Sequence, residues 1–418
     1  MGERLSKFFS ITRKYGIAKS LALVIRYFKA TCIDKFGLSF ILNRNTITTE
    51  LRCALGGRYD KVIIRRSSFG YDVPLFQRPQ HLARSMAEKG CLVFYEVSSM
   101  TDRIRGIKKV CDNLYLINLT DIFICRKLMK ELREISKPKY IEIYSTDRKP
   151  RVKDIFSYKK LGYKIIYQYI DHISPALSCT RKVPKSIVEK YRLVISDPEI
   201  YVVATSSILY EDIRKQRRDG RLVLSTNGVD NSHFENYSDH VLDDDFINIA
   251  KFGRPVICYY GAIASWIDYD LLSEIDLCGR FSVVLIGAKY DDSFCRLSGM
   301  KNVFYLGKRD YKALKYYGRA SDTLIITFLI NDITSATSPV MLFEYMAIGR
   351  PIVCTDMDEC RKYKSVLIGK NHADFISQLD AALQLKNDEV YTKLLKKEAL
   401  ENDWHIKAKE IIDLLGGE

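Results

Sequence analysis

Short runs of β-branched and aromatic residues alternate with longer helix-like segments from residue 61 onward. The first series of runs is KVIIRRSS, LVFYEVSS, LYLINL, YIEIYST, KIIYQYI, YVVATS and LVLST, and the second is VICYYG, SVVLIG, NVFYLG, TLIITFL, IVCT and SVLIG. Strands separated by helices pair in parallel through right-handed crossovers. The pattern therefore predicts an α/β fold with two Rossmann-like, doubly wound parallel sheets.

A polar, turn-rich stretch, SDHVLDDDFINIAKFGRP, lies between the two series and predicts an interdomain linker at 238–255. The chain is too long for one ordinary core, which favours two main domains. We predict a basic N-terminal helical extension over 1–55, a first Rossmann-like domain over 56–237, a second over 256–400 and a C-terminal helix over 401–418.

The N-terminal segment IAKSLALVIRYFKATCI predicts a basic amphipathic helix. Leu21, Val24, Ile25 and Phe28 fall on one side, and Lys19, Arg26 and Lys29 fall elsewhere. Such a helix either lies in an anionic headgroup layer or packs its apolar side on the first domain.

The composition indicates the cellular compartment in which the protein is expected. Eleven cysteines, without a paired CxxC spacing, are typical of a reducing cytoplasm. Neither a signal-peptide core nor a run of eighteen apolar residues occurs, so we expect a protein that is neither secreted nor membrane-spanning.

Charge is distributed unevenly along the chain. Residues 1–235 carry 44 Lys and Arg against 24 Asp and Glu, whereas residues 236–418 carry 22 against 27, which together give the net charge of +15. A basic first half indicates an anionic partner there, either a lipid surface or a phosphate-bearing substrate, although a solvated lysine-rich surface is the alternative.

The most informative stretch is SPVMLFEYMAIGRPIV, which begins at Ser338. Thr337, Ser338 and Pro339 predict a helix N-terminus with a hydroxyl N-cap and a proline in the first turn. Its free N–H groups attract an anion such as a diphosphate. Glu344 stands among apolar neighbours, where a carboxylate needs a partner such as a pair of ligand hydroxyls. Gly349 is expected to end the helix, and IVCT to follow as a strand.

Several motifs in fixed order resemble the bacterial retaining glycosyltransferases of the GT-B fold, of the group 1 or family 4-like type that builds capsule, O-antigen and teichuronic-type polysaccharides. The motifs are FQRPQHLARSMAEKG, VVATSSILYEDI, STNGVDNSHF, YYGAIASWIDYDLL, NVFYLGKRDYKAL and the stretch that ends at Val353. The resemblance covers roughly residues 60 to 385.

This resemblance implies transfer from a nucleotide-sugar donor to a lipid-linked or oligosaccharide acceptor, with retention and without a metal or other cofactor. It also implies a cytoplasmic protein, peripheral on the inner face of the cell membrane, with an anionic membrane surface as a partner and no nucleic acid. A sugar-nucleotide epimerase of the same fold and a weakened nucleotide-sugar-binding scaffold subunit remain alternatives.

One departure from the family pattern concerns the donor site. Many relatives carry two glutamates eight positions apart, the first near the donor sugar and the second on the nucleotide ribose. Here Glu344 holds the second position, but Ala336 holds the first, and Met341 stands where the most similar subgroup often has lysine. The ribose contact carries over, whereas the sugar and phosphate contacts must come from elsewhere, or activity is altered or absent.

Ligands of doubly wound sheets bind beyond the carboxyl ends of the strands, so polar residues in those loops are the donor-site candidates. In the second domain we expect these to be Gly261, Lys308, Arg309, Asn331, Thr334, Thr337 and Ser338, together with Glu344. Lys308 and Arg309 directly follow VFYLG and could neutralise a diphosphate, or could simply form an exposed basic helix start.

In the first domain, KIIYQYI delivers Asp171 and His172 to the sheet edge as catalytic candidates. Asp171 could orient an acceptor hydroxyl and His172 could shuttle a proton, or the pair could be a helix cap beside a solvated histidine. Arg78 and His81 are candidates for acceptor or phosphate contacts, although a lone helical histidine is more often structural. The run from Asp243 to Asp245 resembles a metal-binding DxD, but no strand precedes it, which favours a solvated run.

Overall fold

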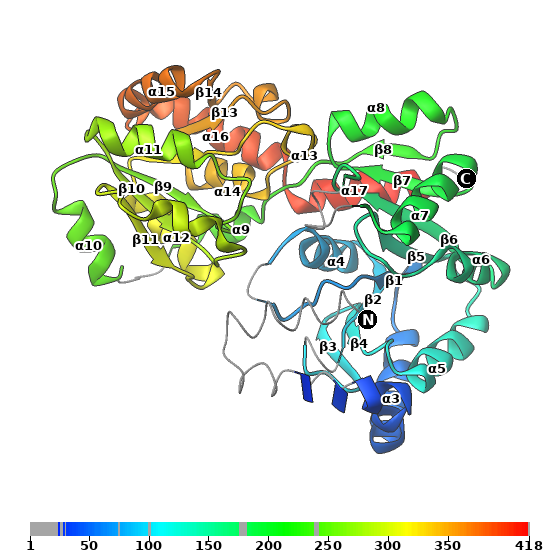
Figure 1. Cartoon of the computed structure of the whole chain (residues 1–418). Coiled ribbons are helices and arrows are strands. Elements are labelled where there is room, and N and C mark those ends of the chain that lie inside the picture. The colour runs from blue at the N-terminus through cyan, green and yellow to red at the C-terminus, as the bar shows by residue number, and fades with distance from the viewer. Residues whose placement is uncertain are drawn as a thin grey trace. The chain divides into compact units, whose positions relative to one another are not determined.

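The computed structural model describes residues 24–25, 28–29, 31–73, 76–98, 102–174, 182–237 and 242–416. It contains two sheets, one of eight strands and one of six, with α-helices between most successive strands (Figure 1). The predicted α/β class and the doubly wound sheets are confirmed.

The eight-stranded sheet has the order β3-β4-β2-β1-β5-β6-β7-β8. Its strands are β1 Lys61–Arg66, β2 Cys91–Glu96, β3 Ile107–Cys111, β4 Leu114–Ile117, β5 Lys139–Tyr144, β6 Lys164–Tyr169, β7 Tyr201–Ala204 and β8 Leu222–Leu224. The helices of this part are α3 Leu38–Leu55, α4 Arg78–Glu88, α5 Ile122–Arg133, α6 Val152–Lys160, α7 Lys185–Ser196, α8 Ser207–Gln216 and α9 Asn231–Glu235.

All seven strands predicted for this part form, but the pattern missed β3. This strand pairs antiparallel with β4 across a tight turn in which Asn113 has a φ of 60°. Its lysines, Lys108 and Lys109, are exposed at the sheet edge, so the strand lacks the apolar run by which the others were found.

The six-stranded sheet is parallel throughout and has the order β11-β10-β9-β12-β13-β14. Its strands are β9 Val256–Tyr260, β10 Ser282–Ile286, β11 Val303–Gly307, β12 Thr323–Ile326, β13 Ile352–Thr355 and β14 Val366–Gly369. The helices that follow the linker are α10 Asp244–Ala250, α11 Tyr269–Cys278, α12 Tyr311–Ala320, α13 Asp332–Ser335, α14 Val340–Ile348, α15 His372–Leu385, α16 Glu389–Glu401 and α17 Trp404–Gly416, with 3₁₀ turns η2 Asp292–Leu297 and η3 Cys360–Lys362.

Every residue of β9 and β10 is buried, as expected for strands covered on both faces. The strand order reverses between β9 and β12, which places a topological switch point at their carboxyl ends. Ligands of doubly wound sheets bind at such a point.

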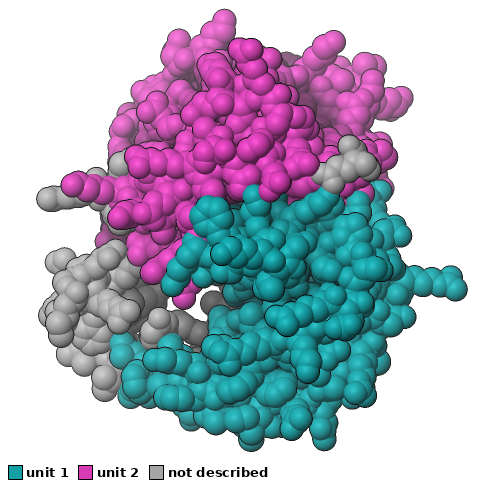
Figure 2. Space-filling view, turned by 90° about the vertical axis from the view of Figure 1, so that its right-hand side faces the viewer, with its two compact units in different colours: residues 1–73, 86–143, 153–165 teal, residues 74–85, 144–152, 166–418 magenta. Residues whose placement is uncertain are grey.

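By its internal contacts the chain divides into two compact units, coloured separately in Figure 2. The first comprises residues 1–73, 86–143 and 153–165, and the second comprises 74–85, 144–152 and 166–418. The second unit holds the six-stranded sheet together with β6, β7, β8 and the start of α4. The predicted domain boundaries and the linker, of which residues 238–241 are not described, stay predictions.

The C-terminal segment contains two helices, and the second, α17, lies within the range 401–418 for which the sequence predicted a helix. α16 ends at Glu401, and α17 begins at Trp404. Between them, Val229 N donates to the Asn402 carbonyl and Trp404 N donates to the Val229 carbonyl, both at 3.0 Å. These two bonds replace helical bonds, and α17 then lies against β7 and β8 with Trp404 buried.

Most of the predicted N-terminal amphipathic helix, including Lys19, Leu21 and Arg26, lies outside the described residues. Of its apolar side, Val24, Ile25 and Phe28 are described and exposed. In the part of the chain that the structure describes, no helix combines the length and apolarity that a membrane span needs.

Candidate active site

Helix α14 and strand β13 form where SPVMLFEYMAIGRPIV predicted them. Gly349, with a φ of 77°, ends the helix in the left-handed conformation that favours glycine. The predicted hydroxyl cap is wrong, because Pro339 is the N-cap and no side chain caps the helix. The first N–H groups of α14 therefore have no side-chain acceptor from the cap residue.

Glu344 is the buried carboxylate that the sequence predicted, with 5% of its surface exposed. Burial raises the pKa of Glu344 to about 7, and the nearby hydroxyls of Tyr311 and Tyr260 offset part of that rise. Both tyrosine hydroxyls are themselves buried. A carboxylate in these surroundings gains from any ligand that brings hydrogen-bond donors to it.

At the carboxyl edge of the six-stranded sheet, the backbone segments at Gly261 and Gly287 lie very close to each other. A Cβ on Gly287 would stand 1.6 Å from the carbonyl oxygen of Gly261, so no side chain fits there. A Cβ on Gly261 would stand 2.8 Å from the Cε of Met341. Tyr345 fixes α14 to this edge, because its hydroxyl accepts from Tyr260 N at 3.0 Å. Met341 and Gly261 therefore share the switch point.

Asn331, Thr334 and Thr337, predicted for donor binding, shape the loop before α14. Asn331 caps the short helix α13 and accepts from Ile333 N at 3.0 Å, and its own N–H donates to Thr334 Oγ1 at 3.0 Å. The Thr337 hydroxyl donates to the Ile333 carbonyl at 2.8 Å. These bonds fix the loop, and contacts of the three side chains with a donor stay predictions.

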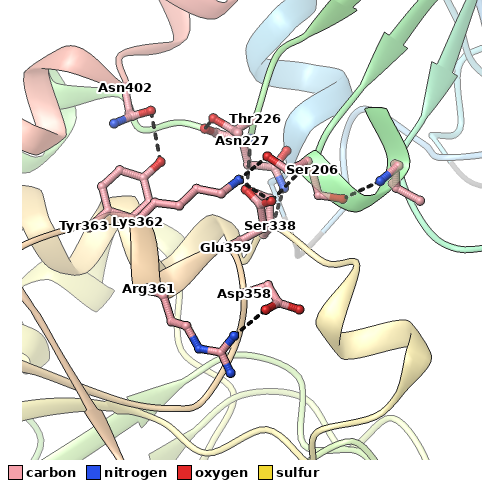
Figure 3. Close-up of polar contacts among 12 residues, drawn as sticks. Ser206, Thr226, Asn227, Ser338, Asp358, Glu359, Arg361, Lys362, Tyr363 and Asn402 are labelled. Atoms are coloured by element: carbon pink, nitrogen blue, oxygen red, sulfur yellow. Dashed lines mark hydrogen bonds and ion pairs between the residues drawn. The ribbon is translucent and has the colours of Figure 1, made fainter. Parts of the chain in front are cut away.

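Ser338 is held by Asn227, which the sequence did not single out beyond its STNGVD motif (Figure 3). Asn227 N donates to Ser338 Oγ at 3.2 Å, and Asn227 Nδ2 donates to the Ser338 carbonyl at 2.6 Å. Ser338 is therefore engaged within the protein and only 3% exposed. Near it, Glu359 accepts from Ser207 N at 2.7 Å, and Lys362 donates to Ser207 Oγ at 2.6 Å.

Of the two basic residues after β11, Lys308 is exposed and Arg309 is paired. The Arg309 guanidinium contacts the Asp243 carboxylate, which also accepts from the Tyr317 hydroxyl at 2.6 Å. Asp243 thus has a structural partner. Among the described residues, no three His, Cys, Asp or Glu side chains are arranged to hold a metal ion. A role of Lys308 or Arg309 on a diphosphate stays a prediction, as does metal independence.

Arg78 is bonded within the protein, and its contact with an acceptor or phosphate stays a prediction. Its guanidinium is 4% exposed and donates to the Thr226 carbonyl at 2.8 Å and to Gln168 Oε1 at 3.1 and 3.2 Å. A further contact at 3.5 Å reaches Asn227 Oδ1. Arg78 therefore joins α4 to the end of β6 and to the Asn227 loop, instead of presenting a free cation to a phosphate.

His81 is a packing residue in this structure. Its ring stacks on Trp404 with centroids 5.1 Å apart and lies 4.7 Å from Phe76 and 6.1 Å from Tyr311. Burial lowers the pKa of His81 to about 3, so the ring is neutral near pH 7. Tyr311 thereby lies between His81 and Glu344, which the sequence could not show.

Asp171 and His172 follow β6 and are half-buried. Burial raises the pKa of Asp171 to about 7. Nδ1 of His172 is buried and has no hydrogen-bond partner among the described residues. Residues 175–181, which belong to the segment that Asp171 would cap in the alternative interpretation, lie outside the described residues. A carboxyl that titrates near neutrality suits proton transfer or a hydrogen bond to a hydroxyl.

The second unit thus brings several predicted residues together. Arg78, Asn227 and Ser338 form one hydrogen-bonded chain, and Gly261, Met341 and Glu344 lie on or beside α14. Asn227, Tyr260 and Tyr311 were missed as site residues, although they lie in the motifs STNGVDNSHF, YYGAIASWIDYDLL and NVFYLGKRDYKAL.

Comparison with known proteins shows similarity to glycosyltransferases. No family model matches the chain. A candidate teichuronic acid biosynthesis glycosyltransferase of Bacillus subtilis strain 168, TuaH, is 22% identical over 313 residues, which cover 71% of this chain and 78% of that protein.

Solved structures of glycosyltransferases match over most of their length at low sequence identity. A trehalose-6-phosphate protein of E. coli, bound with UDP-2-fluoro glucose, has a TM-score of 0.62 at 12% identity and covers 86% of this chain and 99% of its own. HepE of Anabaena, in complex with UDP, has a TM-score of 0.58 at 12% identity and covers 86% and 100%. Sucrose-phosphate synthase of Thermosynechococcus elongatus has a TM-score of 0.58 at 12% identity and covers 85% and 98%.

These similarities confirm the predicted resemblance, and the fold of the chain is the GT-B fold of these proteins. The protein that matches in sequence, TuaH, is named for the kind of polysaccharide synthesis that the motifs indicated.

Proposed function

We propose that this protein is a glycosyltransferase of polysaccharide biosynthesis that transfers a sugar from a nucleotide-sugar donor, with UDP as the preferred nucleotide. The proposal rests above all on Glu344, a buried carboxylate on α14 at the carboxyl edge of a doubly wound sheet. Similar structures carry UDP or a UDP-sugar, and TuaH is named for teichuronic acid synthesis.

In the proposed complex, Glu344 accepts hydrogen bonds from the ribose hydroxyls. The carboxylate then gains the donors that its buried position lacks, which lowers its pKa and stabilises the charged form. The N-terminus of α14, without a side-chain cap, lets backbone N–H groups approach the diphosphate. Backbone N–H groups would thus replace part of the phosphate contact of a lysine that relatives have at this position. This chain has Met341 there.

The proposed transfer proceeds with retention, as the resemblance implies. The departing diphosphate itself takes the proton of the incoming hydroxyl on the same face of the sugar, so no enzymic base is needed for that step. Stabilising the negative charge on the leaving group is then the main electrostatic task. Asp171 would orient the acceptor hydroxyl, since its raised pKa lets it act as donor or acceptor near neutrality.

A weakened, donor-binding scaffold is the second candidate, and Ala336 favours it. Ala336 is fully buried in place of the sugar-contacting glutamate of relatives. A scaffold would bind the nucleotide sugar without turnover, whereas an epimerase of the same fold would turn it over without an acceptor. The leading proposal includes a lipid-linked polysaccharide acceptor at the inner face of the cell membrane.

Thermal denaturation with a panel of UDP, GDP and dTDP sugars tests the proposal. A ligand at about one hundred times its dissociation constant stabilises the folded state by about 2.7 kcal/mol, so a UDP-sugar should raise Tm clearly. Release of UDP only when an acceptor is added identifies a transferase. Stabilisation without release supports the scaffold, and no stabilisation by any nucleotide sugar contradicts both.

A further inference from the structure

Large apolar side chains are exposed at the starts of helices α3 and α5. Phe36, in the turn before α3, is 64% exposed, and Ile41 and Leu42 within the helix are 61% and 73% exposed. All of these residues belong to the first unit. Together with three further exposed residues they form what we call the apolar surface: Phe36, Leu38, Ile41, Leu42, Ile122 and Phe123.

Asp121, the N-cap of α5, joins the starts of the two helices, which lie side by side in Figure 1. Its carboxylate accepts from Phe123 N at 2.9 Å and from Phe40 N at 3.2 Å. The rings of Phe40 and Phe123 stack with their centroids 6.3 Å apart. A Cβ on Gly37 would collide with the Phe123 ring, so this ring lies directly on the turn before α3. The side chains of both helices therefore belong to one surface.

The first turn of α3 reverses the burial that is usual for a helix in water. Leu38, Ile41 and Leu42 have the spacing of a helix face that packs on a core, yet all three are exposed. Ser39, between them, is fully buried. Asn43 then departs from helical geometry, with a φ of −123° and a ψ of 20°, and the helix after it buries its apolar residues. A contiguous exposed apolar surface is typical of a site that binds a protein or a membrane.

Basic side chains follow the apolar surface along both helices. Arg44 comes one turn after Ile41 in α3, and Arg126 and Lys130 come one and two turns after Ile122 in α5. We call these three residues the basic margin. All three are exposed, and none forms an ion pair with another described residue. Such a margin is attracted to anionic lipid headgroups.

The acidic residues of this region are engaged within the protein. Asp34 is buried and accepts from Thr120 Oγ1 at 2.7 Å. Asp121 is fully buried as the cap of α5. Glu131 pairs with Lys127 at 2.6 Å. The exposed charged side chains that follow the apolar surface are therefore basic.

The apolar surface lies at the carboxyl edge of the eight-stranded sheet. Strand β4 ends at Ile117, and α5 begins at Ile122. Strands β1, β2 and β4 are parallel, so their carboxyl ends share this edge. Because ligands of doubly wound sheets bind beyond such an edge, a lipid that enters from a bilayer at the apolar surface would arrive on the ligand-binding side of the sheet.

We propose that the apolar surface inserts into the headgroup layer of an anionic bilayer, with the basic margin on the lipid charges. The inference rests on the proposed function, because it assigns the membrane attachment that a lipid-linked acceptor requires. It concerns residues outside the segment 1–30, so this attachment is separate from that of the N-terminal segment. A second copy of the chain fits the surface less well, since a symmetric interface would bring two basic margins together.

The test measures flotation of the full chain with vesicles of phosphatidylglycerol and phosphatidylcholine in equal amounts, and with vesicles of phosphatidylcholine alone. The variant combines Phe36→Gln, Ile41→Gln and Leu42→Gln. The control combines Leu277→Gln, Val390→Gln and Leu400→Gln, which removes three exposed apolar side chains from the second unit. Leu42→Gln alone serves if the triple variant does not fold.

We expect the triple variant to bind the anionic vesicles at least about tenfold more weakly than wild type, and the control to stay within about twofold, because membrane affinity rises with the apolar area buried. Arg44→Gln with Arg126→Gln should weaken binding to the anionic vesicles several-fold and leave binding to phosphatidylcholine unchanged. Wild-type binding in the triple variant, equal loss in the control, or a wild-type chain that floats with neither kind of vesicle overturns the proposal.

Sedimentation without vesicles tests the other occupant. A dimer that is lost in the triple variant, while flotation is unchanged, would assign the surface to a second copy and overturn the proposal. Flotation needs no nucleotide, whereas UDP binding tests the proposed function and should be equal in wild type and variant. If UDP binds and the variant floats like wild type, only the further inference fails. If UDP does not bind, the proposed function fails whatever the vesicles show.

Discussion

At the residue scale, Glu344 is the side chain on which the proposed nucleotide site depends. Its carboxylate is buried beside two tyrosine hydroxyls, with a pKa of about 7 against an ordinary value of 4.5. Keeping such a group ionised without a ligand costs free energy, which a purely structural residue would avoid. The cost is typical of a site that a ligand completes.

The first prediction concerns stability and pH in the Glu344→Gln variant. Because the folded-state pKa is raised, the ionised carboxylate destabilises the native state only above about pH 4.5, and fully above about pH 7. Glutamine lacks this penalty. Without ligand, the variant should therefore gain stability relative to wild type as pH rises, by up to about 3 kcal/mol near pH 8. Urea denaturation near pH 5 and near pH 8 measures the difference, and an equal difference at both values contradicts the assignment.

The second prediction concerns Ala336, where relatives carry a glutamate. Ala336 is fully buried, so Ala336→Glu would place an unpaired carboxylate in the interior. We expect a loss of more than about 3 kcal/mol in the free energy of unfolding and no gain in transfer. Ala320→Glu, at the exposed end of α12, is the control and should change little. Stable, more active Ala336→Glu protein would show that the site retains room for the missing residue.

At the element scale, the ends of β9 and β10 are held closer than any side chain permits. The third prediction follows from Gly287, which has a φ of 155° and lies against the Gly261 carbonyl. Gly287→Ala should destabilise the chain by at least about 3 kcal/mol and reduce nucleotide binding, because the edge must open to admit the methyl group. Gly220→Ala, with nothing within 4 Å, is the matched control. If both variants melt alike, the close approach is not required.

Hydrophobic pattern was sufficient to find the strands of both sheets and helix α14, because each buries a continuous apolar run. The pattern failed for features that depend on contacts with another segment of the chain. Strand β3 is polar and forms only by pairing with β4, and the break between α16 and α17 depends on bonds to Val229, far away in sequence. The internal partners of Arg78 could not be found for the same reason, since they come from β6 and the Asn227 loop.

Some residues of the candidate site could be predicted from the sequence, and others could not. Glu344 could be found because a lone carboxylate in an apolar helix is unusual. Tyr260 and Tyr311, which stand beside it, come from a strand and a helix whose approach no local pattern encodes. The roles of Asp171, His172 and Lys308 stay predictions, because no described contact joins them to Glu344.

At the scale of the whole molecule, the charge of the chain is divided between its halves, with +20 over residues 1–235 and −5 over residues 236–418. An electrostatic asymmetry of this kind directs one half toward an anionic partner. The N-terminal extension, in which residues 1–30 hold seven Lys and Arg against one Glu, is a candidate contact for that partner.

The fourth prediction removes residues 1–30, which contain seven Lys and Arg against one Glu. If this segment attaches the protein to anionic membranes, the shortened chain should float with phosphatidylglycerol vesicles several-fold less than the full chain, with a difference that disappears at high salt. The core should be unaffected, since the buried residues of α3 begin at Ser39. Unchanged flotation assigns attachment to another part of the surface.

The most direct measurement is a crystal structure of the protein with UDP bound. We expect the ribose hydroxyls to lie about 2.6–3.0 Å from the Glu344 carboxylate, with the diphosphate at the start of α14. A nucleotide bound elsewhere, or a Glu344 side chain without contact to it, would rule out Glu344 as the ribose partner.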